Sequence, residues 1–120
     1  MSSSENDKTQ RRFFRVAVDF PVTLIVPGHE LVLPANALDL SGGGMRVATR
    51  TDLPPGQSIV LRFTLPGTQS EKLVHGLVVL SFYDAAKKQY AHGVAFTQYS
   101  RADQAEISAY VARHKVSPRL

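Results

Sequence analysis

Short runs of β-branched and aromatic residues, separated by turn residues, recur along most of the chain. The first run, Val16 to Val26, places Val, Phe and Leu at every second position, which is typical of a strand with one buried face. Further extended runs are His29 to Leu40, Met45 to Thr49, Ser58 to Leu65, Glu71 to Phe82 and Gln89 to Tyr99. Strands at this spacing predict an antiparallel all-β barrel or sandwich.

Proline and glycine indicate where these strands turn. Pro21 lies inside the first run, and because proline cannot donate to a ladder, we expect an edge strand or a bulge there. Pro27-Gly28 predicts a turn, and the segments 66–69 and 84–88 predict two hairpin connections.

The hydrophobic period changes after residue 99. Ser100 is a suitable helix N-cap, with Asp103 three residues further on. A helix from Ala102 to about Arg113 would place three apolar side chains on one face, namely Ile107, Tyr110 and Val111. We therefore expect a C-terminal helix that covers the sheet or plugs the barrel.

Length and composition restrict the class of protein. A chain of 120 residues forms one domain, and without cysteine it has neither disulfides nor thiolate metal ligands. The four histidines stand at no metal-ligand spacing, so we expect no metal and no cofactor. The start of the chain lacks the order of a secretory signal, and no apolar run is long enough to span a membrane. These features predict a cytoplasmic protein without membrane insertion.

The excess positive charge lies at the two ends of the chain. Of the net charge of +4, residues 1–15 carry +2 and residues 101–120 carry +2, while the middle is neutral. Residues 1–10 are polar without apolar periodicity, and we interpret them as a flexible arm. A basic arm beside a neutral body favours a small anion over a nucleic-acid polymer as the partner.

The segment Asp39-Leu40-Ser41-Gly42-Gly43-Gly44 separates two strand-like runs and is the strongest candidate for a site. Glycines permit positive φ and let another molecule approach the main chain, so we predict a binding turn. Asp39 can also be a plain turn-capping carboxylate, and Ser41 a local turn hydroxyl.

Two catalytic interpretations of this turn fail. A phosphate-binding loop needs Lys-Ser/Thr after the glycines and then a helix, whereas Met45-Arg46 and a strand follow here. A nucleophile elbow needs a glycine two residues before the serine, where this chain has Asp39. We therefore expect that the protein is not an enzyme.

A guanine-nucleotide site agrees better with these residues. The N1 and N2 hydrogens of guanine require a carboxylate, and its O6 and N7 accept the forked donors of arginine. Asp39 supplies the carboxylate, while Arg11, Arg12 and Arg15 supply donors that also suit phosphate.

Two motifs together carry a resemblance to a known family. Arg11-x-x-x-Arg15 and Asp39-x-Ser41-x-x-Gly44 resemble the two-part signature of the PilZ domain family, which are bacterial receptors for cyclic di-GMP. The similarity extends from about Arg11 to His114 and includes the segment Gly93 to Phe96. It implies a six-stranded antiparallel β-barrel of the split-barrel type with a C-terminal α-helix over residues 11–114, an arm over 1–10 and a tail over 115–120.

The resemblance also implies roles for individual residues. Arg11 and Arg15 would clamp phosphate and the Hoogsteen edge, Asp39 and Ser41 would hold a guanine, and Gly44 would give room. The full set of candidate ligand-binding residues is Arg11, Arg12, Arg15, Asp39, Ser41, Gly43, Gly44, Arg46 and Gly93.

Several candidates have plainer interpretations. Arg46 is also typical of an ordinary exposed strand arginine. Phe13 and Phe14 more readily anchor the arm to the core than stack on a base, and His92 is equally compatible with a buried or a ligand-binding role.

The sequence thus predicts a non-catalytic cyclic di-GMP receptor whose arm closes over the nucleotide and alters a surface for a downstream protein. Two alternatives remain: an interaction adaptor of the same fold that does not depend on the nucleotide, and a small basic barrel that binds single-stranded nucleic acid.

Overall fold

The computed structural model describes residues 14–115 and contains six strands followed by one helix. The elements are β1 (Arg15–Val26), β2 (Leu31–Ser41), β3 (Gly44–Thr49), β4 (Ser58–Thr64), β5 (Glu71–Asp84), β6 (Gln89–Gln98) and α2 (Arg101–His114). The predicted arm, together with Arg11, Arg12 and Phe13, and the tail beyond Lys115 lie outside the described residues.

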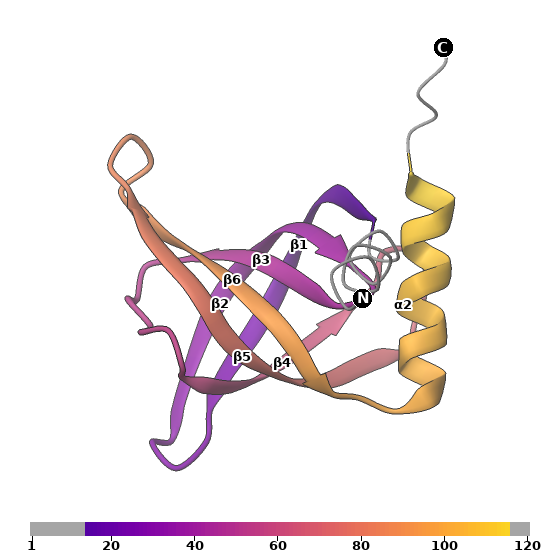
Figure 1. Ribbon diagram of the computed structural model, residues 1–120, viewed down its shortest axis with the longest axis horizontal. Coiled ribbons are helices and arrows are strands. Elements are labelled where there is room, and N and C mark those ends of the chain that lie inside the picture. Colours follow the sequence, from indigo (N-terminus) through magenta and orange to yellow (C-terminus); the bar gives the residue numbers. More distant parts are fainter. Residues whose placement is uncertain (1–13, 116–120) are drawn as a thin grey trace, which may run out of the picture.

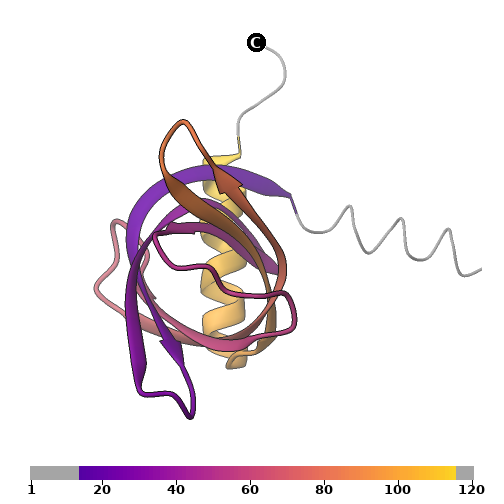
Figure 2. The ribbon, with the colours of Figure 1, turned by 90° about the vertical axis from the view of Figure 1, so that its left-hand side faces the viewer.

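The strands form a closed antiparallel barrel in the order β1-β2-β3-β6-β5-β4. A short ladder closes it, in which Thr23 to Ile25 of β1 pair with Val60 to Arg62 of β4. Figure 1 shows α2 standing across one end of the barrel, and Figure 2 looks along the barrel toward the helix behind it. The six-stranded barrel and its C-terminal helix are confirmed.

Pro21 lies in a closed barrel, but on a stretch of β1 that pairs with β2 alone. A register shift between Ala17 and Phe20 lies just before it, which agrees with the alternative of a bulge. Pro21 pairs with Asn36 of β2, while the ladder with β4 begins only at Thr23. On its β4 side, therefore, the strand has no ladder partner at the proline and loses no hydrogen bond there.

The core fills the inside of the barrel and the gap beneath the helix. Alternate residues of β1 are buried, as the period-two pattern predicts. From the helix, Ile107, Tyr110 and Val111 join the same core. The Ser100 side chain accepts a hydrogen bond of 3.0 Å from the Asp103 backbone N–H, which confirms the predicted N-cap.

Lys72 of β5 is a fully buried lysine that the sequence pattern did not reveal. Its Nζ forms an ion pair with Glu106 of α2, lies 3.9 Å from an Asp103 carboxylate oxygen and donates to the Ser70 carbonyl at 3.2 Å. A buried ammonium is stable only with such partners. The pair therefore fixes the first half of α2 to the barrel.

We predict that Glu106→Gln destabilises the protein by about 1–3 kcal/mol, because it leaves the buried Lys72 ammonium without its nearest charge. The free energy of unfolding in urea measures the effect. Glu71→Gln is the matched control, because the exposed Arg62–Glu71 pair, 3.8 Å apart, is expected to contribute less than about 1 kcal/mol. Equal effects of the two substitutions would contradict the assigned role of Lys72.

Candidate functional site

The glycine turn is the two-residue connection between β2 and β3. Ser41 pairs with Gly44 across it, and Gly42-Gly43 form the turn. The Ser41 hydroxyl accepts from the Gly43 N–H at 3.2 Å and donates to the Gly44 carbonyl at 3.3 Å. Ser41 therefore has a local role in the turn and also lines the cavity described below.

The positive φ that glycines permit is not used at this turn. Among the described residues, the glycines with positive φ are Gly28, Gly56 and Gly67. Gly44 is instead required by packing, since a Cβ added to it would lie 2.5 Å from the Val94 carbonyl oxygen of β6. The close approach predicted for the turn is thus made, at Gly44, by the chain's own neighbouring strand.

Asp39 lies where three strands meet. It stands opposite Ala17 of β1 and Arg46 of β3, so an arginine from each flanking strand reaches it. The Arg15 Nη1 lies 3.3 Å from one carboxylate oxygen, and the Arg46 Nε lies 2.7 Å from the other. Asp39 is buried, whereas the Arg15 and Arg46 side chains are 61% and 40% exposed. The carboxylate therefore positions two arginines at the surface.

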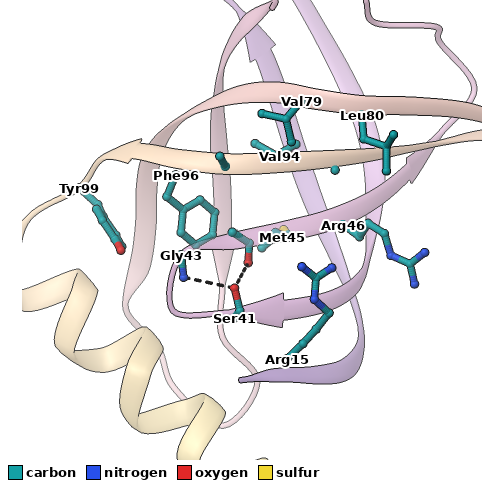
Figure 3. Close-up of a pocket in the computed structure, with 13 residues that line it drawn as sticks. Arg15, Ser41, Gly43, Met45, Arg46, Val79, Leu80, Val94, Phe96 and Tyr99 are labelled. Carbon is teal, nitrogen blue, oxygen red and sulfur yellow. Dashed lines mark hydrogen bonds between the residues drawn. The ribbon is translucent and has the colours of Figure 1, made fainter. Parts of the chain in front are cut away.

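A cavity of about 530 Å³ opens beside this cluster, over the outer face of β3 and β6 (Figure 3). Arg15, Ser41 and Arg46 form its polar side. Its remaining lining residues are Gly43, Gly44, Met45, Val79, Leu80, Gly93, Val94, Ala95, Phe96 and Tyr99. A volume of this size is in the range of small-molecule sites.

Most of the candidate residues from the described part of the chain meet at this cavity. Arg46 lines it and contacts Asp39, so it is more than an ordinary exposed arginine. Gly43, Gly44 and Gly93 also line it. The sequence motif alone did not indicate that Arg46 would reach Asp39, because that contact depends on the register of β2 and β3.

Two aromatic candidates lie elsewhere. Phe14 is 51% exposed, and the Lys115 Nζ at the end of α2 lies 3.7 Å from its ring centroid. Its predicted anchoring in the core is wrong, because it rests against the outside of the helix. His92 is fully buried, with its ring nitrogens 2.8 Å from the Ser81 hydroxyl and 2.9 Å from the Thr51 carbonyl, which is a structural role.

The apolar side of the cavity was missed in the sequence. Val79 and Leu80 of β5, with Phe96 and Tyr99 from the end of β6 and beyond, complete it. The Tyr99 hydroxyl also donates to the Gly42 carbonyl at 2.6 Å, which ties the turn to the segment before α2. The available signal was the unbroken apolar run Leu77 to Leu80, which departs from strand alternation.

The chemistry of the cluster suits an anion with polar edges. Each oxygen of the Asp39 carboxylate accepts one arginine donor and retains a further lone pair. Among the described residues, the two guanidinium groups have several donors without a hydrogen-bond partner, and these suit phosphate or the O6 and N7 of guanine. Within residues 14–115, no group of three His, Cys, Asp or Glu side chains is arranged to hold a metal ion. The helix in this part of the chain is too short and too polar to cross a bilayer.

Comparisons with known proteins agree with this geometry. The family model of the PilZ domain matches residues 9–113. A comparison with curated proteins finds no match.

Three solved structures share the fold. The inhibitor of motility MotI/DgrA from Bacillus subtilis is 18% identical, with a TM-score of 0.78 over 92% of this chain and 53% of that one. The PilZ domain of YcgR from Escherichia coli, solved with c-di-GMP, is 15% identical, with a TM-score of 0.64 over 88% of this chain and 91% of that domain. MrkH from K. pneumonia, solved as a c-di-GMP complex, is 18% identical, with a TM-score of 0.70 over 85% of this chain and 51% of that one. This chain thus spans about half the length of MotI/DgrA and MrkH.

Proposed function

Because the chain belongs to the PilZ domain family, we propose that it is a non-catalytic, cytoplasmic receptor that binds cyclic di-GMP in the cavity of Figure 3. The observation that carries this proposal is the cluster of Arg15, Asp39 and Arg46 at the edge of that cavity. The complexes of YcgR and MrkH with c-di-GMP support the choice of ligand.

In this proposal the arginines and the carboxylate of the cluster contact different parts of the nucleotide. Arg15 and Arg46 donate to phosphate oxygens and to the Hoogsteen edge of guanine. The Asp39 carboxylate accepts from the N1 and N2 hydrogens of a guanine, which require an acceptor there. Ser41 and the backbone of Gly43 lie beside them at the turn.

Arg15 is the residue best placed to exchange partners. Its side chain is 61% exposed and its contact with Asp39, at 3.3 Å, is longer than that of Arg46. Because the Arg15 end of this pair is exposed and Arg46 keeps its own contact with Asp39, a phosphate group can compete for the Arg15 guanidinium while the carboxylate retains one partner. Ligand binding would then draw Arg15 and the preceding residues toward the cavity.

The N-terminal arm together with Arg11 and Arg12 supplies the second half of the proposed site. Arg11 and Arg12 stand four and three residues before Arg15 in the sequence, within reach of the same nucleotide. Closure of the arm over the ligand would change the surface around β1 that is available to a downstream protein. MotI/DgrA, which shares the fold, is an inhibitor of motility, which supports a regulatory output for a protein of this fold.

We expect Arg15→Ala and Asp39→Ala to weaken cyclic di-GMP binding by about ten- to a hundredfold each, the scale of a lost hydrogen bond to a charged group. Titration calorimetry on the full chain measures the dissociation constants. Arg62→Ala on β4 is the matched control, because it removes an exposed arginine outside the cavity. Wild-type protein that binds no nucleotide at about 50 μM would refute the proposal and favour a nucleotide-independent adaptor. Unchanged binding in both variants would show that the cluster of Arg15, Asp39 and Arg46 is not the binding site.

Removal of residues 1–12 tests the role of the arm separately, because it spares β1 and Arg15. The loss of Arg11 and Arg12 is expected to weaken binding by about tenfold or more, with an unchanged unfolding midpoint. Lys8→Ala, which removes one charge of the arm outside the motif, should bind as the wild type does. A truncated chain with wild-type affinity would show that the arm does not contact the ligand.

A further inference from the structure

Two consecutive apolar side chains of β5 are exposed at the cavity. Val79 is 54% exposed and Leu80 is 55% exposed, and both line the cavity. A regular strand would direct one of them inward, but the register of β5 against β6 shifts between Val78 and Leu80. Bulges of this kind redirect side chains and are frequent beside functional sites. The bulge therefore turns an extra hydrophobic residue toward the cavity.

Gly93 of β6 lies beside the wall that Val79 and Leu80 form, and the fold of the protein does not require a glycine there. A Cβ added to it would lie 3.4 Å from the Leu80 Cβ and 3.8 Å from the Val79 Cγ2, which is ordinary van der Waals contact. Three other glycines have positive φ, and two others would place a Cβ within 3.0 Å of another atom. These are Gly28, Gly56 and Gly67 in the first group, and Gly44 and Gly76 in the second. Unlike these five, Gly93 lines the cavity at a position where neither backbone conformation nor strand packing requires a glycine.

We propose that Val79, Leu80 and Gly93 form an apolar slot that packs against the flat face of one guanine base of the nucleotide. This inference rests on the proposed function, because it assigns a contact to the face of a guanine base, which the charged cluster leaves uncontacted. The strand order places Arg15 and Leu80 on opposite sides of the cavity floor, which β3 and β6 form, as Figure 3 shows. A base inserted between them presents its edges to the arginines and Asp39 and its face to the wall.

The physical role of the slot differs from that of the polar side. A purine face is apolar, and it covers aliphatic side chains that otherwise remain in water. The wall contacts no edge of the base, so it contributes affinity to any purine. The choice of guanine remains with the carboxylate and the guanidinium groups.

A small planar ligand explains the wall better than an apolar segment of a partner protein does. Val79 and Leu80 face the same cavity of about 530 Å³ as Arg15 and Arg46, and a cavity of that size with convergent polar groups is typical of small-molecule sites. Contact with a partner protein is the competing outcome in the experiment that follows.

The test compares cyclic di-GMP binding by calorimetry in full-length variants. Leu80→Ser should weaken binding by about five- to tenfold, the scale of half-burying a leucine side chain. Gly93→Ala should weaken it by about tenfold or more, with an unchanged unfolding midpoint, because its methyl group fits the barrel but occupies the slot. Leu73→Ser is the matched control, because Leu73 is 53% exposed on the same strand and lies outside the cavity. It should bind as the wild type does.

Methyl NMR of the wild-type protein gives a second readout that does not depend on how the variants fold. A base stacked on the wall should shift the methyl signals of Val79 and Leu80 upfield through its ring current, while those of Leu73 stay in place. Wild-type binding that leaves these methyl signals and both variants unaffected would overturn the slot and retain the receptor function, and would favour a protein partner for the wall. Absence of wild-type binding would overturn both proposals.

Discussion

The ion pairs of the buried Asp39 carboxylate determine the arrangement of the whole site. A buried carboxylate needs charged or hydrogen-bonding partners, and here they come from Arg15 on one flanking strand and Arg46 on the other. Two positive charges against one negative charge leave the cluster with a net positive charge at the surface, next to a cavity with an apolar side. This combination suits a ligand that is both anionic and aromatic, and a nucleotide is both.

The barrel produces this cluster through strand order and register. Closure in the order β1-β2-β3-β6-β5-β4 makes β1 and β3 the neighbours of β2, so residues far apart in sequence meet at Asp39. The tight approach at Gly44 brings β3 against β6, and these strands form the floor of the cavity. At the end of the barrel, the buried Lys72 holds α2 through its acidic first turns. The arrangement of Arg15, Asp39 and Arg46 beside the cavity is therefore a consequence of strand order and register.

The sequence predicted the strands, the helix and its cap because period-two patterns, turn residues and capping are local properties. Through the family resemblance it also grouped Arg15, Asp39, Ser41 and Gly44, which lie close together in the structure, whereas Arg11 lies outside the described residues. Features set by register and bulges were not predictable: the contact of Arg46 with Asp39, the exposure of Val79 and Leu80, and the burial of Lys72. The position of Phe14 was predicted incorrectly, because hydrophobicity alone does not say which surface a side chain contacts.

The central claim is that the guanidinium groups beside Asp39 bind the nucleotide. Side-chain NMR of ¹⁵N-labelled arginine tests it directly, because each Nε–H signal reports its own hydrogen-bond partner. During titration with cyclic di-GMP, the signals of Arg15 and Arg46 should shift and saturate with the same dissociation constant, while that of Arg62 stays in place. Saturable binding that leaves both Arg15 and Arg46 unshifted, or that shifts Arg62 equally, would contradict the account.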